Sequence, residues 1–146
     1  MSALFVDTAG WMACADAADP DHDRCSDARD RALESGRLLV TTDFVVDETL
    51  SLMRFRLDLA AAERWWQQIE RSSRLRWERI DATRFDRARD LFFRYRDKDF
   101  SFTDCTSFAV MQELRLTQAL TTDRHFQQMR FQMLPAPKKA IRPRRR

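Results

Sequence analysis

The acidic residues that could do chemistry in this sequence stand at strand ends and helix starts. Asp7 follows the apolar run LFV, and Asp123 follows QALTT, so each comes directly after a predicted strand. The carboxyl ends of parallel strands are where the functional groups of an α/β domain gather. Grouped carboxylate oxygens are ligands that suit Mg²⁺ or Mn²⁺. Either acid alone could equally cap a following helix, so the metal interpretation depends on the acids meeting one another.

The segment TTDFVVDETLSLMRFRLD contains neighbouring acids that helical geometry separates. Rows on a helix surface join positions three and four apart. The row through Asp47 is polar throughout: Asp43, Asp47, Ser51, Arg54 and Asp58. The row through Glu48 is mostly apolar: Phe44, Glu48, Leu52 and Phe55. Glu48 is therefore predicted to point inward, where a carboxylate must be paired, protonated or bound to a cation, because burying it bare is costly.

Asp104, in SFTDCTSFAVMQEL, also faces partly inward, because its row continues to Phe108 and Met111. An alternative is purely structural. Ser101 and Asp104 are three residues apart, which matches a capping box that stabilises a helix start without any chemistry. Taken alone, Asp104 is better explained as a cap. Four such acidic segments could nevertheless converge on one edge of a parallel sheet, and this convergence would favour a metal site.

These residues need a sheet and helices to position them. Short apolar or alternating runs predict strands, and the stretches between them have helical spacing. The predicted strands are LFVD, RLLVTT, LRWERI, QALTTD and RFQML. The predicted helices span about 8–17, 22–35, 43–57, 59–71, 82–96 and 102–114. Strands that alternate with helices predict an α/β domain with a mostly parallel sheet.

The chain has 146 residues, 44% of them apolar, which is enough for one domain with a single core. No apolar run is long enough to span a bilayer, and the N-terminus lacks the pattern of a signal peptide, so a soluble cytoplasmic protein is expected. The last residues, PAPKKAIRPRRR, are basic and contain no acid. We expect residues 1–134 to form the domain and residues 135–146 to be a flexible basic tail. That tail either contacts phosphates or only keeps the chain soluble.

Other site types fit the sequence less well. The two glycines are too few for a Walker-type or dinucleotide-binding loop. The three cysteines form no Cys-x-x-Cys pair, and a zinc or two-histidine mechanism would need both His22 and His125. A calcium-loop spacing begins at Asp19, but Arg24 occupies the position that requires glycine.

Four segments, in order, resemble the PIN-domain ribonucleases of the VapC toxin type: LFVDTAGW, TTDFVVDETLSLM, DKDFSFTDCTSFAVM and ALTTDRHFQQMRFQML. The resemblance runs from Leu4 to Leu134, and its most specific part is SFTDCTSFAVM followed by LTTDRHF. It implies a PIN-like α/β/α sandwich with a mostly parallel central sheet of about four or five strands. Where glycine often precedes the last two strands of the family, this chain has Arg115 and Arg130, which affects turns and leaves the acids intact.

The resemblance assigns the acidic quartet of the family to Asp7, Glu48, Asp104 and Asp123. Asp7 and Asp104 are the expected direct ligands of Mg²⁺ or Mn²⁺, and Glu48 and Asp123 are expected to complete the cluster. The implied activity is metal-dependent endonucleolytic cleavage of RNA, with the ions activating water and stabilising charge on the phosphate.

The resemblance also places two hydroxyls beside the third acid, at Ser101 and Thr103, where they orient it. A small antitoxin that obstructs the acidic cleft is the implied partner, and a homodimer is implied as well. The Trp- and Phe-rich helices over 50–66 are expected to have apolar surface for a partner.

The alternative to an enzyme is a non-catalytic RNA- or protein-binding module with a PIN-like fold, in which the acids are caps and surface charges. A phosphatase is a weaker alternative. Such enzymes commonly place a second Asp two residues after a nucleophilic Asp, and Ala9 stands at that position here.

Overall fold

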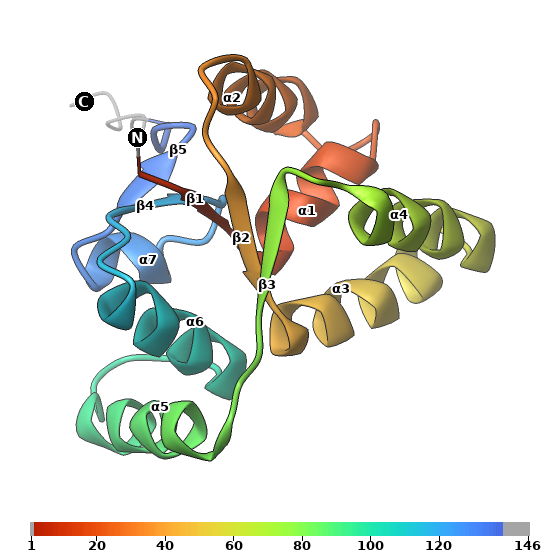
Figure 1. Cartoon of the computed structure of the whole chain (residues 1–146). Helices are drawn as coiled ribbons and strands as arrows, with labels where there is room; N and C mark the ends of the chain where they lie inside the picture. Colours follow the sequence, from red (N-terminus) through yellow and green to blue (C-terminus); the bar gives the residue numbers. More distant parts are fainter. Residues whose placement is uncertain (1, 139–146) are drawn as a thin grey trace, which may run out of the picture.

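The computed structural model describes residues 2–138, which form one sheet with helices on both of its faces (Figure 1). The strands are β1 (Leu4–Val6), β2 (Leu39–Thr42), β3 (Leu75–Glu78), β4 (Gln118–Leu120) and β5 (Gln132–Leu134). The helices are α1 (Thr8–Ala15), α2 (His22–Glu34), α3 (Asp43–Arg56), α4 (Leu59–Arg71), α5 (Ala82–Arg94), α6 (Phe102–Glu113) and α7 (His125–Gln128). Within the described residues, no helix is long and apolar enough to cross a membrane.

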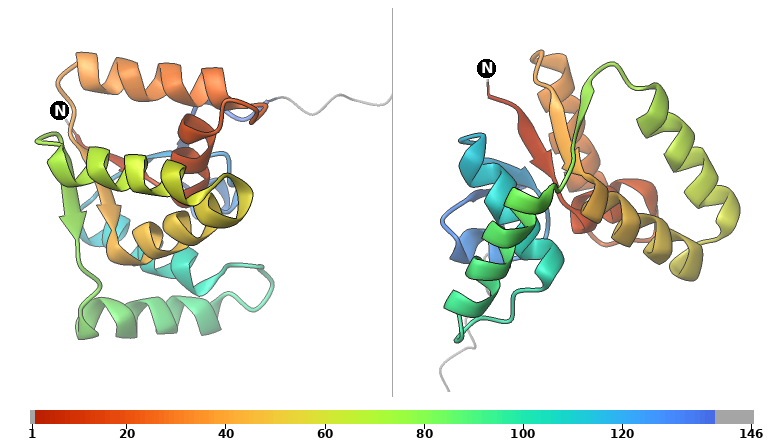
Figure 2. Two further views of the ribbon diagram at one scale, coloured as in Figure 1. Left: turned by 90° about the vertical axis from the view of Figure 1, so that its right-hand side faces the viewer. Right: turned by 60° about the horizontal axis from the view of Figure 1, so that its bottom comes forward.

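All five strands run parallel, in the order β3-β2-β1-β4-β5. Helices α1 to α4 cover one face of the sheet, and α5 to α7 cover the other (Figures 1 and 2). Right-handed crossovers account for this division, because the chain moves outward from β1 to β3 and then returns to β4 on the far side of β1. The predicted α/β/α sandwich with a mostly parallel sheet of four or five strands is confirmed.

The neighbouring strands β1 and β2 are buried over their whole length. A parallel sheet that is covered on both faces favours such short runs of apolar and β-branched residues. The hydroxyl of Thr41 is also fully buried, and it accepts a hydrogen bond from Trp11 Nε1 at 3.2 Å and donates one to the Val6 carbonyl at 3.3 Å. The polar atom of this strand residue is therefore satisfied inside the core.

Three helices end in the same left-handed turn. Gly36, Arg115 and Arg130 have φ angles of 83°, 56° and 66°. The amide of the residue after each of them donates to the carbonyl five residues earlier, at 2.9 to 3.0 Å, as in a Schellman cap. Glycine adopts this conformation without strain, whereas each arginine costs about 1 kcal/mol. At the two positions where the family often has glycine, Arg115 and Arg130 therefore adopt a strained left-handed conformation. The capping hydrogen bonds at these two helix ends are nevertheless formed.

The boundaries of the helices differ from the predicted ones by a few residues. The helix predicted over 8–17 ends at Ala15, and the helix predicted over 82–96 ends at Arg94. Helix α7 has four residues, too few to show helical spacing, and the sequence pattern does not predict it.

Residues 135–138 contact the body of the domain. Arg24, on α2, donates to the carbonyl of Ala136, and Arg124 donates to the carbonyl of Lys138 at 3.1 Å. The beginning of the predicted basic tail is therefore held by two arginines, and the rest of that predicted tail lies outside the described residues.

Candidate active site

Strands β1 and β4 mark the point at which the strand order reverses. From β1 the chain proceeds to β2 on one side, and β4 pairs with β1 on the other side. Ligands of open α/β sheets bind outside the carboxyl ends of the strands at such a point, because the connections leave in opposite directions and open a crevice. Asp7 follows β1 directly, and the segment Thr121–Asp123 follows β4. The two strand-end acids therefore flank one crevice.

Gly10 allows helix α1 to approach the end of β4 closely. A Cβ atom at this position would lie 2.2 Å from the backbone oxygen of Leu120, so a side chain has no room. The same oxygen accepts a hydrogen bond from the amide of Asp7 at 3.2 Å. The glycine therefore allows the close packing of α1 against the end of β4, beside the crevice.

One pocket of about 230 Å³ gathers all four acids of the predicted quartet, Asp7, Glu48, Asp104 and Asp123. Its other lining residues are Thr8, Ala9, Met12, Asp19, Leu52, Arg56 and Thr122. The four acids come from separate elements: the end of β1, the middle of α3, the start of α6 and the β4–α7 connection. The convergence on which the metal interpretation depends is thus a feature of the fold.

Asp7 is the most buried of the four acids, with only 3% of its surface exposed. Its Oδ2 accepts a hydrogen bond from Thr121 Oγ1 at 3.1 Å, whereas its Oδ1 is buried and has no hydrogen-bond partner among the described residues. Burial, and after it the negative charge of Asp104, raises the pKa of Asp7 from 3.8 to about 7. The Asp7 side chain makes no capping hydrogen bond to α1. Helix capping therefore does not explain why an aspartate stands at position 7. A bound cation would give its buried Oδ1 a partner.

Asp104 begins α6 in a reciprocal capping box with Ser101. The amide of Asp104 donates to Ser101 Oγ at 2.9 Å, and the amide of Ser101 donates to Asp104 Oδ2 at 3.0 Å. Burial raises the pKa of Asp104, and the charge of Asp123 adds to the effect. The cap interpretation is confirmed, and it is compatible with a site because the capping box uses Oδ2 and leaves Oδ1 without a hydrogen bond to any described residue.

The hydroxyls that orient the acids are only partly those suggested by the sequence. Ser101 orients Asp104 through the capping box. The hydroxyl of Thr103 makes no hydrogen bond within residues 2–138. Its carbonyl does form one, accepting a hydrogen bond from Thr106 Oγ1 at 2.6 Å within α6. Thr121, which the sequence analysis missed, donates to Asp7 and accepts from the amide of Asp123 at 2.9 Å. The sequence signal that could have identified Thr121 is its position two residues before Asp123, the acid that follows β4.

His125 links two acids of the pocket. Its Nδ1 lies 3.2 Å from Asp104 Oδ2 and 3.1 Å from Asp123 Oδ1. Ionised carboxylates only accept hydrogen bonds, so these contacts are attractive when Nδ1 carries a proton. The ring packs edge-on against Phe100, with centroids 5.4 Å apart. One possible ligand atom from each of His125, Asp104 and Asp123 lies within 4.8 Å of the others, so the described residues bring these three together as a candidate cation site, and Asp7 and Glu48 lie outside this group.

Asp123 makes a local backbone contact at the start of α7. Its Oδ1 accepts a hydrogen bond from the amide of His125 at 2.9 Å, although the N-cap position of α7 is Arg124, which makes no side-chain capping bond. Asp123 therefore combines a contact in the loop before α7 with its place in the pocket.

Glu48 is half-buried and lines the pocket, whereas Asp47 is exposed, as the helical rows predict. The apolar row was wrong at its end, because Phe55 is 85% exposed and Arg56 lines the pocket instead. No described residue covers Phe55 in the last turn of α3, and helical side chains lean toward the N-terminal end of their helix, which suits the long side chain of Arg56 to reach the pocket.

Asp19 is a fifth carboxylate at the pocket. It lies in the connection between α1 and α2, where its Oδ1 accepts from the amide of Asp21 at 2.8 Å. The sequence offers Asp19 only as the first position of a failed calcium-loop spacing. An irregular loop has no period, so only the fold reveals that this residue faces the quartet.

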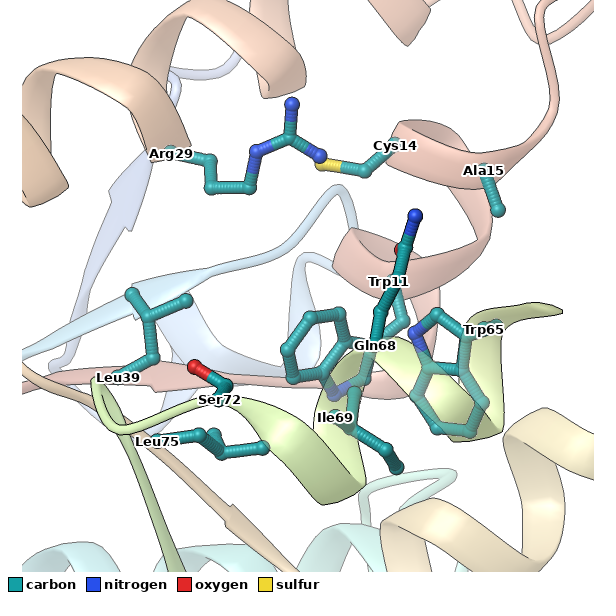
Figure 3. Close-up of a pocket in the computed structure, with 10 residues that line it drawn as sticks. All are labelled: Trp11, Cys14, Ala15, Arg29, Leu39, Trp65, Gln68, Ile69, Ser72 and Leu75. Carbon is teal, nitrogen blue, oxygen red and sulfur yellow. The ribbon is translucent and has the colours of Figure 1, made fainter.

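A second cavity, of about 310 Å³, lies among α1, α2, α4 and the strands β2 and β3 (Figure 3). Its lining residues are Trp11, Cys14, Ala15, Arg29, Leu39, Trp65, Gln68, Ile69, Ser72 and Leu75. None of these is a carboxylate, and none lines the acidic pocket. This second cavity therefore offers no carboxylate for a metal ion, and the group of possible metal ligands found among the described residues is Asp104, Asp123 and His125.

Comparison with known proteins agrees with this geometry. Residues 4–132 match the PIN domain. The 23S rRNA-specific endonuclease VapC20 of Mycobacterium tuberculosis is 30% identical over 123 residues, which cover 84% of this chain and 91% of VapC20. Ribonuclease VapC26 of the same organism is 26% identical over 130 residues, covering 87% of this chain and 92% of VapC26.

The similarity extends to a solved structure. The crystal structure of M. tuberculosis VapC20, a sarcin-ricin loop cleaving toxin, superposes with a TM-score of 0.79 and 29% sequence identity. The superposition covers 88% of this chain and 96% of the VapC20 chain. Since the PIN-domain match spans nearly all the described residues and the same fold recurs in a relative of similar length, the chain belongs to the PIN-domain family.

Proposed function

We propose that this protein is a Mg²⁺- or Mn²⁺-dependent endoribonuclease and acts as the toxin of a toxin–antitoxin pair. The observation that carries the proposal is the meeting of four carboxylates, from four separate elements, in one pocket at the carboxyl edge of the sheet. Both mycobacterial relatives bear the names of RNA-cleaving enzymes, which supports the same chemistry here.

The donor atoms of the pocket suit a hard divalent cation. We assign Asp7 and Asp104 as direct ligands, because Asp7 Oδ1 is buried without a donor and Asp104 keeps one oxygen free of hydrogen bonds to described residues. Glu48 and Asp123 complete the cluster. When bound there, Mg²⁺ or Mn²⁺ supplies the Lewis acidity that activates water and stabilises negative charge on the phosphate.

The chain's own residues hold the acids in place for this role. Thr121 donates to Asp7, and the amide of Ser101 donates to Asp104. His125 spans Asp104 and Asp123. These contacts join the chain's own residues to one another, which supports a cluster that is preorganised for the reaction.

Ribosomal RNA is the substrate class that we propose. VapC20 is a 23S rRNA-specific endonuclease, and the similarity between it and this chain covers most of both proteins. A loop of large-subunit rRNA is therefore the first substrate to test.

A small antitoxin and a second copy of the chain are the proposed partners, in the cytoplasm. The turn between α3 and α4, beside the acidic pocket, exposes apolar surface at Phe55 (85%) and Leu59 (57%), which supports an antitoxin that covers the pocket from this side. Helix α5 exposes Phe85, Phe92 and Phe93, which supports a self-association surface on the opposite face of the sheet. Light scattering of the purified chain, compared with a Phe93→Ser variant, tests the homodimer.

The ribonuclease proposal is tested by incubating purified protein with bacterial 23S rRNA. We expect cleavage with Mg²⁺ or Mn²⁺, no cleavage in excess chelator, and loss of cleavage in Asp7→Asn and Asp104→Asn proteins that keep the wild-type circular dichroism. Asp47→Asn, an exposed neighbour of Glu48 on α3, is the matched control and should cut normally. Cleavage undiminished by both pocket substitutions would refute the site, and tight RNA binding without cleavage under any metal condition would favour the binding module.

The toxin role is tested in cells. Expression of the wild-type chain should arrest growth, expression of Asp7→Asn should not, and co-expression of the small protein encoded beside the gene should restore growth. Equal growth in all three cultures would contradict a toxin.

A further inference from the structure

Arg56 is the one cationic side chain among the described residues that line the acidic pocket. It stands in the last turn of α3, eight residues after Glu48, which corresponds to about 12 Å along the helix axis. Glu48, Leu52 and Arg56 follow one another at intervals of four residues and form one wall of the pocket. That wall leads from the acids to the rim.

A structural role does not account for the position of Arg56. Arg84, by comparison, pairs with Glu78 at 3.0 Å and with Glu113, whereas no carboxylate within residues 2–138 forms an ion pair with Arg56. A cation in the last turn of a helix also stabilises the helix end through its dipole. Arg54 stands in the same last turn, is exposed and does not line the pocket. The helix dipole would favour both arginines equally, so it does not explain why Arg56 in particular lines the pocket.

A guanidinium at the rim of an anionic pocket is suited to a phosphate. The five carboxylates of the pocket repel the RNA backbone, and a cation beside them offsets this repulsion where no metal ion is bound. Arginine presents its N–H donors in a planar fork that matches two phosphate oxygens. Because Arg56 stands about two helical turns from Glu48 along α3, it is placed to meet a phosphate beside the reacting one.

We propose that Arg56 binds a non-scissile backbone phosphate of the RNA and so fixes the strand on the α3 side of the acidic pocket. The proposal rests on the ribonuclease function proposed above. A contact of this kind is equally strong before and during the reaction, so its loss weakens substrate binding and leaves the chemical step unchanged.

The kinetic test compares Arg56→Gln, Arg56→Lys and the matched control Arg54→Gln in Mg²⁺-dependent cleavage of 23S rRNA. For Arg56→Gln we expect KM to rise about tenfold while kcat stays within about twofold of wild type. Arg56→Lys keeps the charge without the fork and should restore only part of the lost affinity. Arg54→Gln should match wild type in both constants. Since both arginines are exposed, circular dichroism should show the wild-type fold in every variant.

A binding test does not depend on cleavage. The affinity for a labelled single-stranded RNA is measured by fluorescence anisotropy against salt concentration, in an Asp104→Asn background with and without Arg56→Gln. Loss of one phosphate contact should lower the slope of log K against log salt by about 0.7. If the wild-type protein cuts no RNA, the ribonuclease proposal fails, and this measurement still decides the role of Arg56.

Two results would overturn the inference. One is an unchanged KM and an unchanged salt slope in Arg56→Gln. The other is a change in Mn²⁺ affinity, measured by calorimetry on the Arg56→Gln protein, with RNA affinity unchanged, because Arg56 would then act on the carboxylates and not on the substrate.

Discussion

The burial of Asp7 leads to a quantitative prediction about the stability of the metal-free protein. Its pKa is about 7 in the folded protein, against 3.8 for an ordinary aspartate. The folded state therefore holds the proton more tightly than the unfolded state. Stability from this group is fully present below pH 4 and is lost as the pH rises through 7. Linkage converts the shift into a loss of about 4 kcal/mol in total, of which about 3 kcal/mol falls between pH 5 and 8.

The Asp7→Asn variant isolates this contribution, because asparagine keeps the shape of the side chain and cannot ionise. Its amide oxygen can still accept the hydrogen bond from Thr121. In chelator the variant should be more stable than wild type, and the difference in the free energy of unfolding should grow by about 3 kcal/mol from pH 5 to pH 8. Asp104, whose pKa is also raised by burial, titrates in both proteins, so the difference between them reports mainly on Asp7.

Urea denaturation followed by circular dichroism at four pH values between 5 and 8 measures this difference. A gap between the two proteins that stays constant over the range would refute the raised pKa of Asp7. Adding Mg²⁺ gives a second measurement, because an ion that binds the folded state alone should stabilise wild type and leave Asp7→Asn unchanged. Asp47→Asn, at an exposed position of α3, is the control and should follow wild type in both experiments.

Further substitutions test the contacts around the pocket and the left-handed turns. His125→Ala removes the link between two carboxylates, so calorimetry should find Mn²⁺ binding weaker by about tenfold, and an unchanged affinity would show that the link is dispensable. Gly10→Ala brings a Cβ within 2.2 Å of a backbone oxygen of β4 and should cost about 1–3 kcal/mol in urea denaturation; a neutral result would contradict the close approach. Arg115→Gly and Arg130→Gly each relieve a left-handed residue and should raise the free energy of unfolding by up to about 1 kcal/mol, whereas Gly36→Ala, the reverse control, should lower it.

The strands and most of the helices could be predicted from the short-range periodicity of the sequence. Each strand is a brief apolar or alternating run, and a buried parallel sheet needs little more than that. The choice of Glu48 over Asp47 likewise follows from the angular spacing of residues on one helix, and the structure gives the two residues different exposure. Asp7 was identifiable because it directly follows a strand.

The meeting of the acids could not be predicted from any local pattern. It depends on the strand order β2-β1-β4, which brings the ends of β1 and β4 together although the strands are far apart in the chain. The resemblance to a known family supplied that information. Asp19 was missed because an irregular loop has no period, and His125 because its contact with Asp104 joins different elements. Arg56 was missed because the row analysis continued through Phe55, at a helix end that nothing covers.

A structural role and the proposed metal-binding role can belong to one side chain. Asp104 accepts the amide of Ser101 in a capping box, and Asp123 accepts the amide of His125 at the start of α7. Asp7 lacks such a cap, and one of its oxygens has no donor among the described residues. Burial raises the pKa of Asp7 to about 7 and raises the pKa of Asp104 as well, so keeping these two groups ionised is costly without a cation. For this reason the pH dependence of unfolding, measured without RNA, reports on the same oxygen that we assign to the metal.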